Sequence, residues 1–131
     1  MTACAFITGV CGVALTATER AFVREAQPWG LILFKRNIDT AAQVMALTAS
    51  FRDAVGADAP VLIDQEGGRV QRLGPPQWPR YPAAAVYGRL YERDRTVGLA
   101  AVQLGTRLIA DDLRQLGIDV DCLPVADVPA P

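Results

Sequence analysis

The sequence predicts an α/β protein built on a parallel β-sheet. Short apolar segments alternate with amphipathic helical segments along the chain, an order that requires parallel pairing through right-handed crossovers. Residues 31–34 (LILF) form a continuous apolar run, which is typical of a strand buried on both faces of a parallel sheet. A (β/α)8 barrel and a doubly wound open sheet share this pattern, and both bind ligands at the carboxyl ends of their strands.

The first two repeating units are each a strand followed by a capped helix. Residues 3–7 are small and apolar, and Thr16 with Glu19 predicts a capping box that starts a short helix. Residues 31–34 make the second strand, and a second capping box at Thr40 starts a longer helix. One apolar stripe on that helix has helical spacing and consists of Val44, Leu47, Phe51 and Val55.

The third unit is longer, because a loop separates its strand from its helix. The strand, residues 61–63, runs directly into the polar segment 64–72, and a proline- and aromatic-rich stretch follows. A helix over residues 96–116 then precedes the fourth strand, residues 120–123. A loop of this length in a compact domain is usually functional. We expect its two aromatic residues to anchor it to the protein body; they are Trp78 and Tyr81.

Composition argues against several classes of partner. Hydrophobic residues make up 51% of the 131 residues, which is enough for a packed core. The 13 basic and 14 acidic residues leave a net charge of −1, so charge gives no reason to expect a nucleic acid or an anionic membrane surface. No apolar run approaches the ~20 residues of a membrane-spanning helix. We therefore expect a small polar or neutral ligand.

The residues that usually build metal and nucleophile sites are scarce. Histidine is absent, which excludes a Ser-His-Asp or Cys-His site built from this chain alone and any histidine-ligated metal. Cys4, Cys11 and Cys122 show no C-x-x-C spacing, so they predict neither a disulfide framework nor a zinc site. This usage fits a reducing, cytoplasmic setting, and we expect the cysteines to be small buried residues.

The most informative stretch is residues 64–72, DQEGGRVQR, which follows the third strand. Gly67 and Gly68 let the backbone turn sharply or approach a ligand closely. Asp64 at a strand end can accept two hydroxyl hydrogen bonds, and an arginine adds several donors in one rigid plane. Neighbouring hydroxyls of a sugar ring suit this combination. A charged turn with internal Asp–Arg pairing explains the same residues equally well.

Other polar residues near the strand ends carry weaker hypotheses. Asp64 and Glu66 could form the carboxylate pair of a glycoside hydrolase, whose carboxyl groups lie about 5–5.5 Å or about 6.5–9.5 Å apart. Adjacent residues of one loop seldom flank a bond from opposite faces, so we interpret Glu66 as structural. Arg36 and Asn37 follow the second strand, and we interpret them as support for neighbouring strand ends. Asp127 follows the fourth strand.

Four segments together resemble glycoside hydrolase family 3. In chain order they are GLILFKRN (30–37), DQEGGRVQR (64–72), LGID (116–119) and PVAD (124–127). The second segment is highly specific for the family, and the resemblance covers nearly the whole chain. The most similar members are the bacterial cytoplasmic β-N-acetylglucosaminidases of cell-wall recycling.

The resemblance implies a fold, a reaction and two binding residues. The fold is a (β/α)8 TIM-type barrel truncated after about its fourth strand, so that residues 1–131 form the N-terminal half of one glycoside hydrolase domain. The reaction is retaining hydrolysis that removes non-reducing terminal β-N-acetylglucosamine from muropeptides in the cytoplasm. Asp64 and Arg72 match family positions that bind the hydroxyls of that sugar. The family uses no cofactor or metal.

The chain departs from the family pattern at the catalytic residues. The family's nucleophile is an aspartate on a later strand, its acid/base is a histidine on a mobile loop, and a further sugar-binding arginine follows the fourth strand. None of these is present, and Gly9 stands near a position where many relatives carry an aspartate. We therefore expect the chain alone to be inactive, to have no catalytic residue of its own and to need the missing C-terminal half.

Two other hypotheses remain open at the level of sequence. The chain could be a non-catalytic sugar-binding or partner-dependent fragment of the same fold. It could also be an unrelated open-sheet domain that binds a nucleotide.

Overall fold

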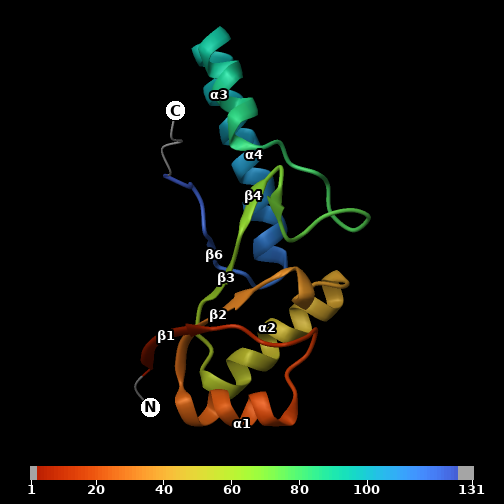
Figure 1. Cartoon of the computed structure of the whole chain (residues 1–131), viewed down its shortest axis with the longest axis vertical. Coiled ribbons are helices and arrows are strands. Elements are labelled where there is room, and N and C mark those ends of the chain that lie inside the picture. The colour runs from red at the N-terminus through yellow and green to blue at the C-terminus, as the bar shows by residue number, and fades with distance from the viewer. Residues whose placement is uncertain (1–2, 127–131) are drawn as a thin grey trace.

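The computed structural model describes residues 3–126, which contain one parallel sheet flanked by helices (Figure 1). The sheet has four strands, β1 (Cys4–Thr8), β2 (Pro28–Leu33), β3 (Val61–Ile63) and β6 (Val120–Asp121), in the order β1-β2-β3-β6. All three neighbouring pairs are parallel, which confirms the α/β class. Spatial order follows chain order, so these four strands show none of the reversal that defines a doubly wound sheet.

Two helices follow β1 and β2 and are held by the predicted caps. Helix α1 (Ala17–Ala26) has the complete capping box between Thr16 and Glu19. Helix α2 (Ala41–Val55) has only half of the predicted box: Thr40 accepts from Gln43 N, but the Gln43 side chain accepts from Asp39 N instead of Thr40 N.

The core lies between the middle of the sheet and α2. Leu31 and Leu33 of β2 pair in register with Val61 and Ile63 of β3, and all four side chains are fully buried. They pack with Val23 of α1 and with the expected stripe of α2, of which Val44, Leu47 and Phe51 are buried and Val55 is partly buried. Phe22, the neighbour of Val23 on α1, is half exposed.

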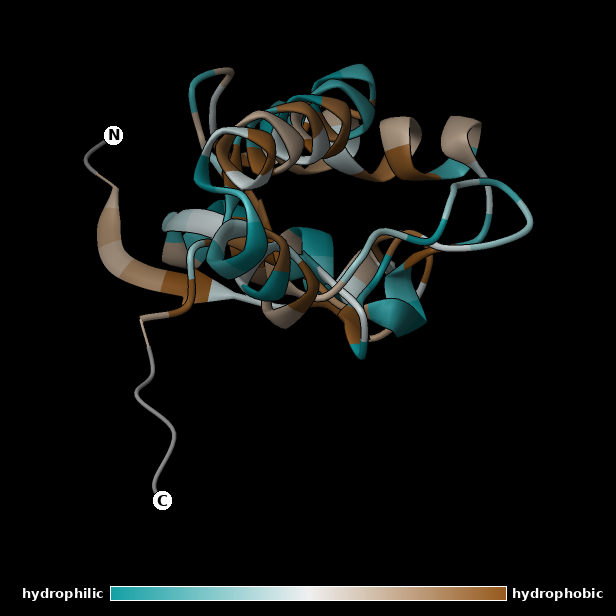
Figure 2. Ribbon diagram, turned by 90° about the horizontal axis from the view of Figure 1, so that it is seen from above, coloured by the Kyte–Doolittle hydropathy of each residue, from teal (hydrophilic) through white to brown (hydrophobic). Residues whose placement is uncertain are grey.

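The edge strand β1 is less buried than the sequence suggested. Each of its residues is exposed or partly exposed, including Phe6 and Ile7 (Figure 2, where β1 lies at the margin of the molecule). The prediction that the cysteines are buried is wrong: Cys4, Cys11 and Cys122 are all exposed. Cys4 belongs to β1, which has a neighbour on one side only within the described sheet, and Cys11 and Cys122 lie beyond the ends of β1 and β6.

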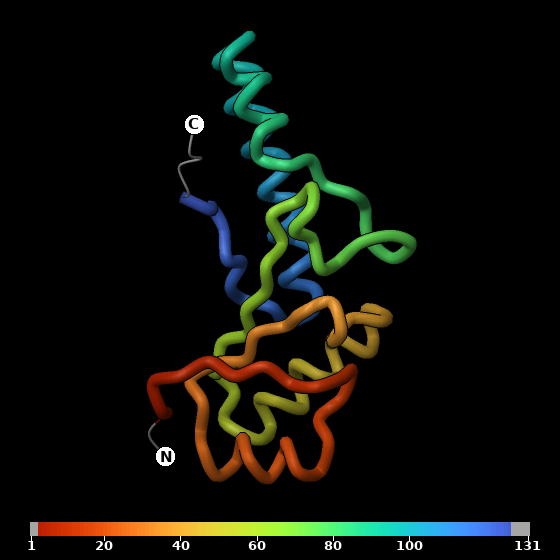
Figure 3. The backbone as a smooth tube through the Cα atoms, in the orientation of Figure 1, coloured from red at the N-terminus to blue at the C-terminus, as the bar shows by residue number. Residues whose placement is uncertain are grey.

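The helix predicted over residues 96–116 is present with nearly the same bounds, and a further helix that the sequence did not predict precedes it. Helix α3 (Ala84–Arg93) runs into α4 (Arg95–Gln115) through the single residue Asp94, and the pair forms an arm that projects from the sheet (Figures 1 and 3). Two apolar residues of α4, Leu104 and Leu108, are at least half exposed. The buried positions that face α3 are instead the glycines Gly98 and Gly105, which let the two helices approach closely.

A second difference from the sequence-based prediction lies directly after β3. Strands β4 (Gln65–Gly67) and β5 (Val70–Gln71) form an antiparallel hairpin that the sequence did not predict. The loop after it is anchored as expected: Trp78 and Tyr81 are each only 8% exposed, and Tyr81 Oη donates to Asp112 Oδ2 of α4 at 2.6 Å. Within the described part of the chain, no helix has the length and apolarity to cross a membrane.

The close contact of α3 and α4 predicts opposite effects for two glycine substitutions. A Cβ at Gly98 would lie 2.6 Å from Tyr91 N, whereas a Cβ at Gly88 would meet nothing within 4 Å. Gly98→Ala should therefore lower the free energy of unfolding by about 1–3 kcal/mol. Gly88→Ala should raise it by about 0.5–1 kcal/mol, because alanine loses less backbone entropy in a helix. Urea unfolding followed by circular dichroism measures both, and equal effects would contradict this packing.

Candidate functional site

The two predicted site residues meet at the carboxyl end of β3. Asp64 directly follows β3 and Arg72 directly follows β5, so the intervening hairpin turns the chain back on itself. Arg72 Nη2 donates to Asp64 Oδ2 at 2.6 Å, and the two side chains are 27% and 24% exposed. An arginine held against a carboxylate in this way fixes the orientation of both groups, while leaving an accessible face of each.

A buried amide, that of Gln65, fixes this arrangement. Gln65 Oε1 accepts from Arg72 N at 2.9 Å and from Leu73 N at 3.0 Å, and Gln65 Nε2 donates to Leu73 O at 3.0 Å. The side chain is fully buried. Sequence reasoning missed this residue, because its polarity looked like that of the loop around it and its burial depends on the unforeseen hairpin.

The two glycines of the hairpin turn are required by both conformation and space. Gly67 and Gly68 have φ values of 82° and 62°, in the left-handed region that favours glycine. A Cβ on Gly67 would lie 3.1 Å from Tyr81 O, and Gly68 N donates to that same oxygen at 2.8 Å. The turn therefore rests directly on the proline-rich loop.

One aromatic ring lies beneath two guanidinium groups. The ring centroid of Phe34 is 4.7 Å from Arg36 Cζ and 5.9 Å from Arg72 Cζ, distances at which a cation is attracted to an aromatic face. Arg72 Nε has no hydrogen-bond partner within residues 3–126. Lys35, in the short 3-10 helix η1 (Lys35–Asn37), donates from Nζ to Arg72 O at 3.2 Å. Arg36 and Arg72 thus share one aromatic ring, and Lys35 is bound to the backbone of Arg72.

Arg36 and Asn37 have the supporting role that the sequence indicated. Asn37 Nδ2 donates to Val10 O at 3.0 Å and to Gly12 O at 2.8 Å, and Arg36 Nε donates to Val10 O at 2.9 Å. These bonds hold the loop after β1. A Cβ at Gly9 would lie 3.2 Å from Arg36 Nη2, so any side chain at this position would contact that guanidinium.

Glu19 secures the same loop from the other side. Its carboxylate accepts from Cys11 N at 2.7 Å and from Thr16 N at 2.9 Å. These backbone hydrogen bonds, with one from the Thr16 hydroxyl, lower the pKa of Glu19 from 4.5 to about 2. The loop is therefore a fixed part of the rim at neutral pH.

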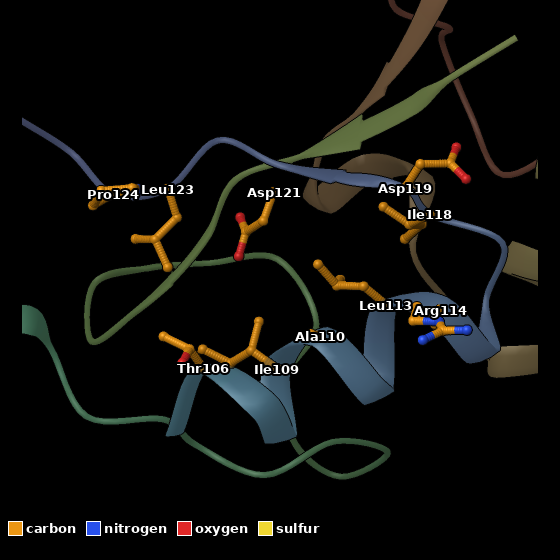
Figure 4. Close-up of a pocket in the computed structure, with 10 residues that line it drawn as sticks. All are labelled: Thr106, Ile109, Ala110, Leu113, Arg114, Ile118, Asp119, Asp121, Leu123 and Pro124. Carbon is orange, nitrogen blue, oxygen red and sulfur yellow. The ribbon is translucent and has the colours of Figure 1, made fainter. Parts of the chain in front are cut away.

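Asp121 of β6 links the hairpin to the neighbouring strand. Its Oδ1 accepts from Gln65 N at 2.9 Å. The carboxylate points toward α4 into a largely apolar cavity of about 440 Å³, beside Ile109, Leu113 and Leu123 (Figure 4). Burial raises the pKa of Asp121 from 3.8 to about 6, and the negative charges of Asp64 and Glu66 add to the rise.

The structure gives no information about Asp127 and shows no metal site among the residues that it describes. Asp127 lies outside the described residues. Within residues 3–126, no group of three or more histidine, cysteine, aspartate or glutamate side chains could hold a metal ion.

The chain is similar to a family model and to curated enzymes. The model described as "Glycosyl hydrolase family 3 N terminal domain" matches residues 7–130. A β-hexosaminidase of Bordetella avium is 38% identical over 122 residues, which are 91% of this chain and 34% of that protein. A β-hexosaminidase of Xanthomonas axonopodis pv. citri is 35% identical over 93% of this chain and 36% of its own length. The chain thus spans about a third of the length of these relatives.

Solved structures agree with the sequence matches. NagZ from Neisseria gonorrhoeae, in complex with N-trifluoroacetyl-D-glucosamine, superimposes with a TM-score of 0.88 at 30% identity, over 94% of this chain and 36% of that one. A family 3 β-N-acetylglucosaminidase from Paenibacillus sp. str. FPU-7 has a TM-score of 0.78 at 27% identity, over 91% of this chain and 22% of that one. In both cases the shared fold is accompanied by a sequence identity of 30% or 27% over more than nine-tenths of this chain.

The raised pKa of Asp121 predicts a pH dependence of stability. Because the folded-state pKa of about 6 exceeds the ordinary value of 3.8, the native state binds more protons than the unfolded state between these values. Stability should therefore fall as pH rises through this window. Asp121→Asn keeps an oxygen acceptor for Gln65 N but cannot ionise, so it should flatten the pH dependence and be the more stable protein at pH 7.

The control is Asp53→Asn, which removes an exposed carboxylate on α2 that makes no hydrogen bond or ion pair within residues 3–126. Urea unfolding at several pH values between 4 and 7 measures both variants. An unchanged pH profile in Asp121→Asn would show that this carboxylate does not titrate in the expected range.

Proposed function

Because this chain belongs to glycosyl hydrolase family 3, whose N-terminal domain it matches, we propose that it forms the first part of a (β/α)8 barrel that releases terminal β-N-acetylglucosamine. The sequential order of four parallel strands supports this fold, because a barrel adds each new strand beside the last. Residues 1–131 then correspond to the N-terminal half of the hydrolase domain.

One observation carries the functional proposal: Asp64 and Arg72 form a hydrogen-bonded pair at the carboxyl end of β3. This is the end of the strands where barrels bind their substrates. Asp64 can accept hydrogen bonds from two sugar hydroxyls, and the remaining guanidinium N–H groups of Arg72 can donate to sugar oxygens. The relative from Neisseria gonorrhoeae, solved with an N-acylated glucosamine, supports a ligand of this class.

The substrate that we propose is a muropeptide with a non-reducing terminal N-acetylglucosamine, hydrolysed with retention of configuration. In the family that the chain resembles, the nucleophile and the histidine acid/base belong to later parts of the sequence, and this chain contains no histidine. We therefore assign sugar binding, and no catalytic residue, to residues 1–131. Free cysteines within the described residues fit the cytoplasm as the working compartment.

The assignment of Asp64 and Arg72 predicts that substitution of either residue weakens sugar binding. Asp64→Asn and Arg72→Ala should each weaken the binding of N-acetylglucosamine by about 10- to 100-fold, as expected for a lost hydrogen bond to a charged group. Arg107→Ala should have no effect, because Arg107 is exposed on α4 and makes no hydrogen bond or ion pair in the described structure. Chemical-shift titration of the 131-residue chain measures all three.

The same titration with a panel of nucleotides separates this proposal from a nucleotide-binding domain. Binding of a nucleotide but not of N-acetylglucosamine, or sugar binding that survives Arg72→Ala, would refute the sugar site.

The missing catalytic groups predict that the chain alone does not turn over substrate. Incubation with a chromogenic β-N-acetylglucosaminide should release no more chromophore than a heat-denatured sample of the same protein. Release above that background, if lost in Asp64→Asn, would mean that residues 1–131 contain a nucleophile and an acid/base that have not been recognised.

A further inference from the structure

Both edges of the parallel sheet are unpaired within residues 3–126. Strand β1 has β2 as its only neighbour, and β6 has only β3. Alternate backbone N–H and C=O groups of an edge strand point away from the sheet, where they can pair with a further strand. All three neighbouring pairs are parallel, so β1 and β6 run in the same direction. The β6 edge of one molecule can therefore accept the β1 edge of another in parallel.

The β1 edge exposes large apolar side chains. Phe6, Ile7 and Trp29 are 38%, 43% and 47% exposed. Together with Ala5 they line an apolar hollow of about 540 Å³, which we call the β1 hollow. Figure 2 shows β1 at the margin of the molecule. Apolar side chains that gather at an unpaired strand are typical of a surface that another protein covers.

The β6 edge lies beside a cavity of similar apolar character. This is the cavity of about 440 Å³ between β6 and α4, which we call the β6 cavity. Leu123 and Ile109 approach it from opposite sides in Figure 4, and Leu113 lies deeper along α4. One edge of the sheet thus has protruding aromatic side chains, and the other edge has an apolar cavity. Two such edges suit each other in both shape and polarity.

The order of the strands selects a second copy of this chain as the partner. The four strands follow one another in the sheet, and they are half of the eight that close a barrel. A twofold axis parallel to the barrel axis would bring β6 beside the partner's β1 at two places at once, so that no edge stays open. A different protein with one suitable edge would cover only one of the two. The net charge of −1 produces little repulsion between copies.

We propose that two copies of this chain associate by pairing β1 of each copy with β6 of the other, which closes a parallel sheet of eight strands. The carboxyl ends of all the strands then lie at one end of the closed sheet. The Asp64–Arg72 pairs of both copies therefore open onto the same mouth. The inference rests on the proposed barrel fold, but it does not require that either pair binds a sugar.

The mass of the 131-residue chain in solution is the first test. Sedimentation equilibrium at micromolar concentration should give twice the chain mass of 14.1 kDa, with no further rise as the concentration increases, because a closed sheet has no free edge. A folded protein that stays at the mass of one chain would overturn the proposal. A mass that keeps rising through larger assemblies would also overturn it, because the edges would then pair without closing.

Two charged substitutions, one beside each edge, test which surfaces meet. Ile7→Lys alters the β1 hollow, and Leu123→Glu alters the β6 cavity. Each variant should self-associate about 100-fold or more weakly than wild type, because an unpaired charge is buried at both joints of its dimer. An equimolar mixture of the two variants should form a dimer again. In that mixed dimer one joint is unaltered, and the other brings the lysine of one copy towards the glutamate of its partner.

The matched control is Leu104→Lys on α4. Leu104 is 61% exposed and lines neither the β1 hollow nor the β6 cavity, so this variant should remain dimeric. Amide spectra of each variant confirm that the fold is retained. A monomeric Leu104→Lys, an Ile7→Lys that dimerises like wild type, or a mixture that stays monomeric would each overturn the β1–β6 pairing. Loss of N-acetylglucosamine binding from an intact dimer would instead overturn only the sugar site.

Discussion

The buried amide of Gln65 is the constraint on which the site depends. It is the partner of two backbone N–H groups and one carbonyl on the far side of the hairpin, and its own backbone N–H donates to Asp121 of the next strand. Each of these groups would cost about 1–3 kcal/mol if it were buried without a partner. The pairing of Asp64 with Arg72 therefore follows from a hydrogen-bond network that joins β3, the hairpin and β6, and a charged turn on the surface would not produce it.

Sequence reasoning found the elements whose signals are local. The sequence analysis identified the buried runs of β2 and β3, the Thr16 capping box and the apolar stripe of α2. Strand burial, capping and helical periodicity each depend on residues that are close together in the chain. The position of Arg72 beside Asp64 was also anticipated, although the sequence could not separate a sugar site from an internal ion pair. The structure shows the ion pair between Asp64 and Arg72, and this pair is compatible both with internal pairing alone and with a sugar site.

What the sequence did not reveal depends on contacts between distant segments. Helix α3 has no side-chain cap to mark its start and no buried residue, and its stability comes from packing on the glycine face of α4. Gln65 looked like a loop residue, because its burial requires the chain to return at Leu73. Net charge misled in the same way: a nearly neutral chain concealed that Lys35, Arg36 and Arg72 come together when η1 lies beside the hairpin.

The long sequence separation of these contacts also sets the order in which the protein can assemble. Gln65 and Asp121 are 56 residues apart, and Tyr81 and Asp112, which fix the loop beneath the hairpin turn, are 31 apart. Closing loops of this length costs chain entropy that no nearby contact repays, so such pairings form late. When only the first hundred residues have been synthesised, every side chain of the rim is present. The elements that hold the rim in place, β6 and the C-terminal part of α4, have not yet been made.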